Sequence, residues 1–260
     1  MSKDSSSKSV KSEQSVARSW PKAFLTTIAV IFGFLAAQLI GVVIFVSLLS
    51  AFGLSSDQIQ DQFNNNAWAQ LGAIVSIESL TIGLVYWYFK LANRKPLKFL
   101  KLDKKPTKKL FGTVALTYLL YFPVFVAVAT LASVLIPSLD TEQMQQIGFE
   151  NTSGLDYVAV FVALAILPPL VEEIVFRGIL FQKLKQYASL VPAVLITSII
   201  FGLAHLEFFS DAPLNWIAAL DTFVFSLFLI GVFLKTNSLW SAILLHALKN
   251  SVAFMFLFLL

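Results

Sequence analysis

The sequence contains no cysteine in its 260 residues, which excludes a disulfide framework, thiolate metal ligands and a cysteine nucleophile. Charged residues are also scarce, at 13%, whereas 57% of the residues are hydrophobic and 25 are phenylalanine. The mean hydropathy is +0.79. Such a composition predicts an all-α polytopic membrane protein and not a soluble domain.

The sequence also lacks an internal repeat, and this absence disfavours an inverted-repeat transporter. Lys and Arg are confined largely to two segments, residues 1–22 and residues 90–109. This distribution is typical of cytoplasmic loops beside anionic lipid and differs from a nucleic-acid-binding patch. We therefore expect the chain to lie in a lipid bilayer and to bind no nucleic acid.

Hydropathy predicts about seven membrane-spanning helices. Residues 1–22 are polar and are expected to form a disordered cytoplasmic tail. The apolar run that follows is about twice as long as a signal-peptide core and has no convincing cleavage site, so we interpret it as a retained span. The expected spans are residues 23–52, 67–91, 110–136, 157–185, 190–209, 214–234 and 238–260.

Loop charges predict the orientation. Residues 90–109 hold nine Lys or Arg and a single acid, whereas residues 137–156 hold four acids and no basic residue. Basic and acidic or neutral loops alternate in this way along the chain. The pattern predicts a multi-pass protein of the cell membrane with a cytoplasmic N-terminus and an external C-terminus.

Residues 171–178, Val-Glu-Glu-Ile-Val-Phe-Arg-Gly, place three charges inside an apolar run. An ionised side chain at the centre of a membrane helix costs roughly 2.5 to 3.5 kcal/mol, so these charges need partners. Glu173 and Arg177 are four residues apart with the acid first, the favourable order for an ion pair. Glu172 points about 100° away and remains available. Pro168-Pro169 just upstream removes two backbone donors and frees carbonyls one turn earlier.

The two histidines of the sequence, His205 and His246, both lie in apolar segments of the last third. His205 follows Phe201 by four residues, and Asn250 follows His246 by four, so each pair is expected to share a helix face. Either histidine alone is equally well explained as an interhelical hydrogen-bond donor.

Estimates of depth in the membrane place Glu172, His205 and His246 at a similar distance from the cytoplasmic surface. Glu172 is eleven residues from Lys183, and His246 is eleven from Lys235, which puts both roughly 16 Å from the cytoplasmic boundary at the helical rise. His205 reaches the same depth only if its helix starts near Leu190, which we adopt.

A carboxylate, two imidazoles and an amide in a dry cavity suit the activation of water. Glu172 and one histidine would take the proton, while the other histidine and Asn250 would stabilise an oxyanion, as amide hydrolysis requires. Alternatively, Glu172, His205 and His246 are three ligands of a catalytic zinc with an open fourth position, although the HExxH spacing is missing.

Other polar and small residues in the apolar runs have simpler explanations. Glu78 and Asp221 are expected to be hydrogen-bonded membrane acids, with a proton relay as the alternative. Lys249 can snorkel or pair with Asp221. Gly178 and Gly202 are expected to allow close helix packing.

At these residues the sequence resembles the CPBP family of intramembrane proteases, also called the Abi or CAAX protease family. The family includes type II CAAX prenyl endopeptidases and lysostaphin-resistance-protein-A-like membrane proteins. Glu172-Glu173-x-x-x-Arg177 is similar to its EExxxR motif, Phe201-x-x-x-His205 to FxxxH, and His246-x-x-x-Asn250 to HxxxN. The resemblance spans about residues 155–255, so the chain is expected to divide into a disordered tail (1–22), N-terminal transmembrane helices with the basic loop (23–154) and a CPBP-like catalytic core (155–260).

The resemblance implies an intramembrane endopeptidase that acts on a membrane-associated peptide or protein. Glu172 would be the general base, His205 its partner on the attacking water, and His246 with Asn250 the oxyanion stabilisers. Glu173 and Arg177 would support them. The alternative is a non-catalytic membrane protein that uses the same cavity for bacteriocin immunity or cell-envelope regulation.

The family is often named as metalloproteases, yet two features of this sequence favour a metal-free mechanism. A zinc-bound histidine usually needs an acceptor for its other ring nitrogen, and the clear acids nearby are Asp221 and Glu173, the latter committed to Arg177. Asn250 is a poor zinc ligand but a good donor to an oxyanion. We expect a glutamate and histidine mechanism, with zinc on the carboxylate and two imidazoles as the alternative.

Overall fold

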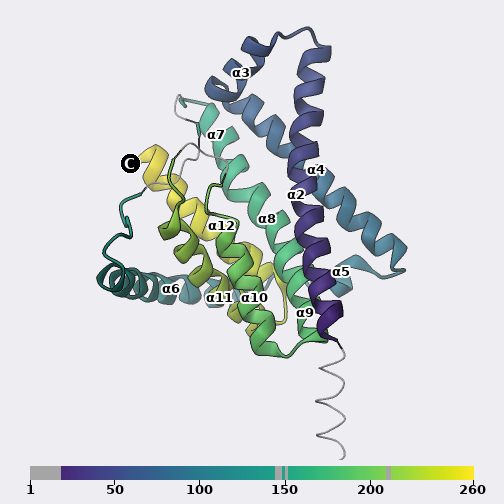
Figure 1. The fold of residues 1–260 in the computed structure, drawn as a ribbon, viewed down its shortest axis with the longest axis vertical. Coiled ribbons are helices and arrows are strands. Elements are labelled where there is room, and N and C mark those ends of the chain that lie inside the picture. Colours follow the sequence, from purple (N-terminus) through teal and green to yellow (C-terminus); the bar gives the residue numbers. More distant parts are fainter. Residues whose placement is uncertain (1–18, 144–147, 150–151, 209–211) are drawn as a thin grey trace, which may run out of the picture.

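A computed structural model describes residues 19–143, 148–149, 152–208 and 212–260 (Figure 1). Within these ranges every regular element is a helix, and six helices are long and apolar enough to cross a membrane. The expected all-α, multi-pass fold is therefore confirmed. Most of the tail predicted to be disordered, residues 1–18, lies outside the described ranges.

The candidate spans and their connections follow the chain in order. The six spans are α2 (Trp20–Ala51), α4 (Ala67–Leu91), α6 (Lys108–Leu135), the continuous helix Asp156–Tyr187, α11 (Trp216–Thr236) and α12 (Leu239–Phe254), which continues as the π-helix η3 (Met255–Leu259). The short helices α3 (Ser56–Asn65) and α5 (Pro96–Phe99) lie in the connections.

Polar residues set the starts of several helices by accepting hydrogen bonds from otherwise unpaired backbone N–H groups. Ser55 forms a capping box with Gln58 at α3, and Asn66 caps α4 by accepting from two backbone N–H groups. Thr107 caps α6, and Asn215 caps α11. These caps explain why the apolar runs begin as helices where they do.

The helix Asp156–Tyr187, which we call the central helix, alternates between α and π turns. It comprises α7 (Asp156–Phe161), η1 (Val162–Ile166), α8 (Leu167–Glu173), η2 (Ile174–Phe181) and α9 (Gln182–Tyr187). The carbonyl of Leu164 would accept from residue 168 in an α turn or from residue 169 in a π turn, and both are prolines without an N–H. The Pro-Pro pair thus leaves one carbonyl with no donor inside its own helix.

The fifth expected span is wrong in its extent. Helix α10 runs only from Leu190 to Leu203, and its 14 residues cover about 21 Å, less than the roughly 30 Å of a bilayer core. The helix does start at Leu190, as expected. It ends because Leu206 turns back into the core, where its carbonyl accepts from the Asn215 backbone N–H. The end expected at residue 209 falls outside the described ranges.

The helices pack around the central helix (Figure 1). Helices α2 and α4 pair on one of its sides, and α10, α11 and α12 lie on the other, with α6 against α11 and α12. Gly202 permits the predicted close helix packing, whereas Gly178 makes room for a side chain from the turn after α5. A Cβ on Gly202 would lie 2.7 Å from the carbonyl oxygen of Ala219, and one on Gly178 would lie 2.6 Å from the Leu100 side chain.

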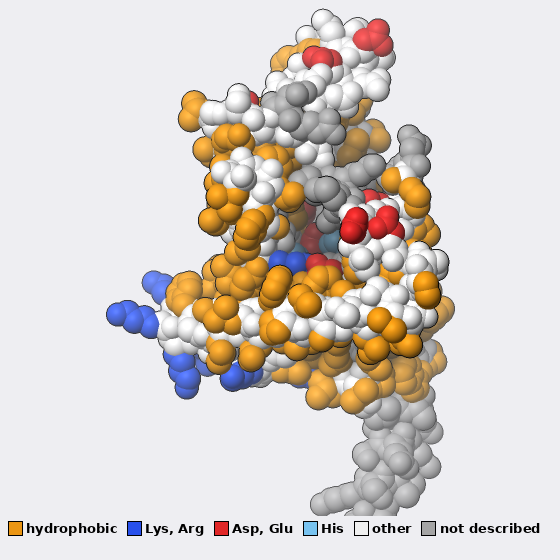
Figure 2. Space-filling view, turned by 90° about the vertical axis from the view of Figure 1, so that its left-hand side faces the viewer, with side chains coloured by type: hydrophobic (Ala, Val, Ile, Leu, Met, Phe, Trp, Pro, Cys, Tyr) orange, Lys and Arg blue, Asp and Glu red, His pale blue; other side chains and the backbone are white. Residues whose placement is uncertain are grey.

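Charged side chains are unevenly placed on the surface. Figure 2 shows acidic side chains at the top of the molecule, where α3 lies, and Lys and Arg side chains projecting from its lower half. Between them, acidic, basic and histidine side chains gather in a hollow above an apolar helix. This hollow is the candidate site.

Candidate functional site

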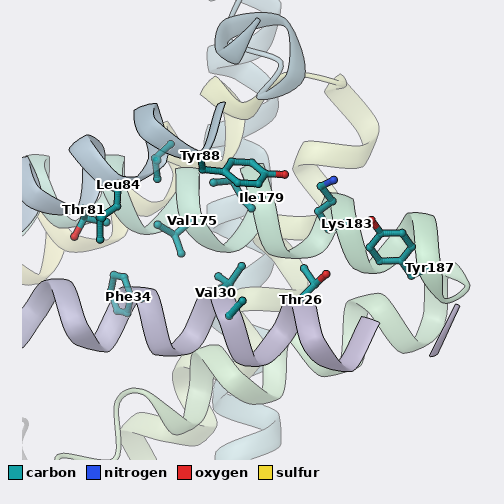
Figure 3. A pocket seen from close by; sticks show the side chains of 13 residues that line it. Thr26, Val30, Phe34, Thr81, Leu84, Tyr88, Val175, Ile179, Lys183 and Tyr187 are labelled. Carbon is teal, nitrogen blue, oxygen red and sulfur yellow. The ribbon is translucent and has the colours of Figure 1, made fainter. Parts of the chain in front are cut away.

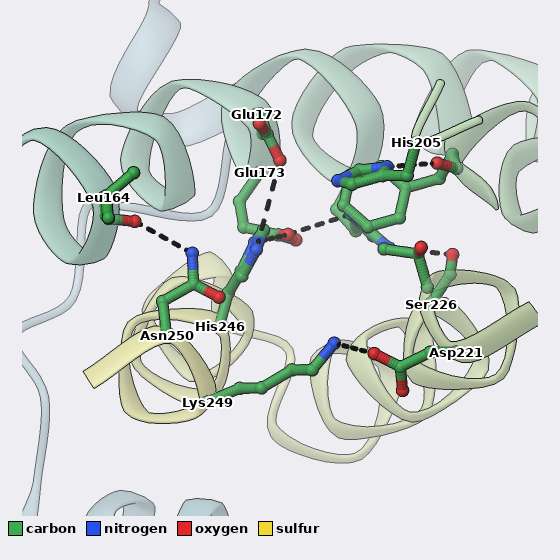
Figure 4. Close-up of polar contacts among 12 residues, drawn as sticks. Leu164, Glu172, Glu173, His205, Asp221, Ser226, His246, Lys249 and Asn250 are labelled. Atoms are coloured by element: carbon green, nitrogen blue, oxygen red, sulfur yellow. Dashed lines mark hydrogen bonds and ion pairs between the residues drawn. The ribbon is translucent and has the colours of Figure 1, made fainter. Parts of the chain in front are cut away.

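Arg177 and Glu173 form a fully buried ion pair on the central helix (Figure 4). The Nη1 atom of Arg177 donates to Oε1 of Glu173 at 2.8 Å, and neither side chain is exposed. Nη2 donates to the Ser226 hydroxyl at 2.7 Å, and that hydroxyl donates to Ser198 at 2.9 Å. The guanidinium carbon lies 4.1 Å from the centroid of the Phe201 ring. One arginine thereby ties the central helix to α10 and α11.

Glu173 has a second partner that the sequence analysis missed. Its Oε1 also lies 3.0 Å from Nδ1 of His246. Because a carboxylate can only accept, Nδ1 carries the hydrogen, and Nε2 of the neutral imidazole is left as an acceptor. That Nε2 lies 4.0 Å from Oε2 of Glu172. Glu173 therefore orients the ring that faces Glu172.

Glu172 is the carboxylate of the motif that forms no ion pair with Arg177, as the sequence predicted. Its Oε2 is buried and has no hydrogen-bond partner in the described part of the chain, although the side chain as a whole is 19% exposed. A buried carboxylate oxygen without a donor is costly, and such a group in a native fold calls for an explanation. This atom is therefore the first candidate for contact with substrate or water.

His205 lies in the turn after α10, so its expected place on the helix is wrong, but its ring still lies beside that of Phe201, with the two centroids 5.0 Å apart. Its Nδ1 lies 2.8 Å from the Phe201 carbonyl oxygen, which again assigns the hydrogen to Nδ1 and leaves Nε2 free. Among the described contacts, the imidazole that faces Glu172 is His246.

Asn250 donates a hydrogen bond to the Leu164 carbonyl, which has no donor within its own helix because residues 168 and 169 are prolines. Its Nδ2 donates to the oxygen of Leu164 at 2.9 Å, joining α12 to η1 (Figure 4). An amide nitrogen carries two hydrogens, so one remains for a further acceptor. Asn250, the predicted oxyanion donor, thus also has a structural role. The sequence indicates both halves of this contact, Pro168-Pro169 and an asparagine in an apolar helix, but not that they meet.

A second charge cluster, which is partly exposed, lies on the α6 side of the hollow. Lys249 pairs with Asp221, one of the two options given by the sequence, and the Tyr121 hydroxyl donates to the same carboxylate. The Lys249 Nζ is 4.7 Å from the centroid of the Phe225 ring. The pair is partly exposed, at 21% for Lys249 and 23% for Asp221. Tyr121 joins α6 to this cluster, a contact between distant segments that no local pattern indicates.

Glu78 on α4 approaches the site from the opposite side. It is buried, its Oε2 has no partner among the described residues, and it is close enough for its charge to interact with that of Glu172. Two carboxyl groups without a cation of their own therefore lie near one another, which the sequence did not reveal because they are 94 positions apart.

The carboxylates and imidazoles of the site are suitable metal ligands by type, but they lie too far apart to share one metal ion. Both histidines bond through Nδ1 and leave Nε2 free, as metal-bound histidines usually do, so the expected shortage of acceptors is wrong. However, no three His, Asp or Glu side chains of the described residues lie close enough together to hold a metal. We therefore derive no catalytic step through a metal.

Comparison with known proteins supports the predicted resemblance. Residues 154–252 match the family described as "Type II CAAX prenyl endopeptidase Rce1-like". The chain is also 31% identical over 107 residues to the "Putative membrane peptidase YdiL" of Bacillus subtilis (strain 168). That similarity covers 39% of this chain and 41% of the relative. No solved structure matches the chain.

The matched range contains all the residues that the three motifs single out: Glu172, Glu173, Arg177, Phe201, His205, His246 and Asn250. It excludes α2, α4 and α6, and with them Glu78 and Tyr121. The surroundings of the site thus extend beyond the region of family similarity.

Proposed function

We propose that this multi-pass membrane protein is an intramembrane endopeptidase that hydrolyses a peptide bond in a membrane-associated protein or peptide. The similarity of residues 154–252 to type II CAAX prenyl endopeptidases supports a membrane protease. The observation that carries the proposal is the pairing of Glu172 and His246. A carboxylate oxygen without a donor faces an unprotonated imidazole nitrogen 4.0 Å away.

This gap suits one water molecule. Two hydrogen bonds of about 2.8 Å can span 4.0 Å if they bend at the water oxygen. Water held in this way donates one hydrogen to Glu172 and the other to Nε2 of His246. Glu173 fixes the imidazole through Nδ1, so the water is oriented before substrate arrives.

In the proposed reaction, the water oxygen attacks the carbonyl carbon of the peptide while Glu172 takes a proton from it. The carbonyl oxygen becomes an oxyanion, which the free N–H of Asn250 stabilises, joined by His205 once its free Nε2 has taken up a proton. The C–N bond then breaks, and Glu172 returns its proton to the leaving amine. The histidine roles are thus exchanged relative to those implied by the family resemblance, because the geometry pairs Glu172 with His246.

A non-catalytic membrane binding protein is the second candidate. The observation in its favour is that Asn250, Glu173 and Nδ1 of both histidines already have structural partners. These contacts would be needed to hold the helices together even without chemistry. Glu172 separates the two functions, since its Oε2 has no hydrogen-bond partner among the described residues and its side chain, unlike that of Glu173, is partly exposed.

The test is a comparison of membranes that contain the unchanged protein or Glu172→Gln, which keeps the shape and removes the base. We expect at least one membrane peptide or protein to stop being cut in the variant, measured by proteomics of new chain ends. Glu142→Gln, an exposed acid outside the three motifs, is the matched control. Identical cleavage products in all three membranes would contradict the endopeptidase and favour the binding protein.

A further inference from the structure

A groove outside the proposed catalytic site lies between α2, α4 and the central helix (Figure 3). Its volume is about 390 Å³, within the range of roughly 300 to 1,000 Å³ that is usual for small-molecule sites. Most of its wall is aliphatic or aromatic and is formed by Val30, Phe34, Leu84, Val85, Val175 and Ile179. A groove of this kind fits a hydrocarbon chain.

One end of the groove is polar. Lys183 and Tyr187 lie together at that end in Figure 3, while Thr81 and Phe34 lie at the other. The polar end is also where α4 and α9 finish, at Leu91 and Tyr187, and where α2 begins at Trp20. Tyr, Trp and Lys are typical of the boundary between hydrocarbon and headgroups. The groove therefore runs inward from a membrane surface.

Two cations at this end lack a carboxylate partner. The Arg94 guanidinium carbon lies 5.4 Å from the centroid of the Phe99 ring, and Lys183 Nζ lies 5.8 Å from the same centroid. The ion pairs in the described part of the chain involve neither residue. Two positive charges gathered at one ring without an acid favour an anionic group beside them.

We propose that the groove is a binding site for an anionic phospholipid. One acyl chain lies along the aliphatic wall between α2 and the central helix, and the headgroup phosphate binds Lys183 and Arg94. A phospholipid meets both requirements at once, since a free phosphate would leave the apolar wall uncovered. The site is independent of the proposed peptidase activity.

Bound lipid would act on the helix that carries the motif residues. Val175 and Ile179 lie on the central helix, within one or two turns of Glu172, Glu173 and Arg177. An acyl chain in the groove fills the space between this helix and α2. The bound state is therefore expected to be more resistant to thermal unfolding than the delipidated protein.

The test measures retained lipid by native mass spectrometry after purification from nanodiscs of phosphatidylglycerol or phosphatidylcholine. The unchanged protein should retain phosphatidylglycerol preferentially. Lys183→Gln and Arg94→Gln should each weaken retention about fivefold, as expected for one cation near a membrane surface. Lys185→Gln, two residues along the same helix, is the matched control.

A second pair of variants tests the groove itself. Gly33 lines the groove, and a side chain there would meet open space, so Gly33→Leu should fill the groove and lower retention of both lipids. Gly83 on α4 has equally open surroundings and is not part of the lining, so Gly83→Leu should change nothing.

Equal retention of the two lipids by the unchanged protein, or full retention in the Lys183→Gln, Arg94→Gln double variant, would overturn the proposal. Unchanged lipid retention in Gly33→Leu would show that the lipid binds outside the groove, which would also overturn the proposal. The charge variants alter exposed or half-exposed ends of side chains, so they keep the test decisive even if Gly33→Leu lowers expression.

Discussion

The Arg177 side chain is fully buried, and the groups around it explain how the protein accommodates its charge. A buried ion pair stabilises a fold only when its remaining hydrogen-bonding groups are also satisfied. Here Glu173, the Ser226 hydroxyl and the face of Phe201 surround the guanidinium, and Glu173 in turn accepts from His246. Nε of Arg177 and Oε2 of Glu173 have no hydrogen-bond partner among the described residues. The ion pair is therefore the hub that positions the ring facing Glu172.

The first prediction separates this hub from the proposed general base. Arg177→Gln leaves Glu173 with a buried charge and should destabilise the protein by about 3 to 5 kcal/mol, because one partner of a buried pair is removed. Glu172→Gln removes an uncompensated carboxylate and should leave stability unchanged or raised. Thermal unfolding in detergent and the amount of protein in membranes measure both effects. Equal stability of the two variants would argue against the hub.

A second prediction concerns Asn250 and the orphaned carbonyl of Leu164. Asn250→Ala should cost about 1 kcal/mol or more, since a part-buried carbonyl loses its donor. In a Pro168→Ala background the helix regains an N–H that can reach Leu164, so the same substitution should cost much less. Unfolding of the two single variants and the double variant gives the coupling energy. Additive losses would show that Asn250 does not act through this carbonyl.

A third prediction follows from the spacing of the ligand-type side chains. Since no three of the described carboxylates and imidazoles are close enough to share a metal, we expect purified protein to keep its peptidase activity after dialysis against a strong chelator. A zinc protease treated in parallel serves as the control. Loss of activity that zinc restores would instead make Glu172, His205 and His246 metal ligands.

At the scale of the elements, hydropathy predicts most helices well because a long apolar run in lipid has few alternatives to a helix. The end of α10 could not be predicted in this way, since residues 204–208 remain largely apolar and the chain turns only because Leu206 packs inward and bonds Asn215. The placement of His205 depends on that turn. Likewise, Pro168-Pro169 predicts which helix has a carbonyl without a donor. The sequence does not predict that Asn250 supplies the donor, because Asn250 lies on another helix.

Close packing of α10 on α11 leads to the fourth prediction. Gly202→Ala should push the two helices apart and destabilise the protein by about 1 to 3 kcal/mol, because its Cβ would lie 2.7 Å from a backbone oxygen that cannot yield. Gly112→Ala, where a Cβ meets open space, should stabilise α6 by up to about 1 kcal/mol. Melting temperatures of the two variants test this. A neutral Gly202→Ala would contradict the close contact.

At the scale of the whole molecule, the described chain combines a family-like region with helices that the similarity does not reach. Helices α4 and α6 lie outside residues 154–252, yet they bring Glu78 and Tyr121 to the site. The sequence motifs identify the site residues within 154–252 but not Glu78 or Tyr121. Contacts between helices that are distant in the sequence follow no fixed residue spacing, so no motif can reveal them. The division into a tail, an N-terminal membrane region and a core stays a prediction.

The last prediction concerns the orientation of this assembly in the membrane. The nine basic residues of segment 90–109 and the acidic, Lys- and Arg-free segment 137–156 predict that the first is cytoplasmic and the second external. Because the chain has no cysteine, Lys104→Cys and Ser138→Cys each introduce a single, exposed thiol. An impermeant thiol reagent added to intact cells should label position 138 and not position 104, and both should react after permeabilisation. Labelling of position 104 alone in intact cells would contradict this orientation of the chain in the membrane.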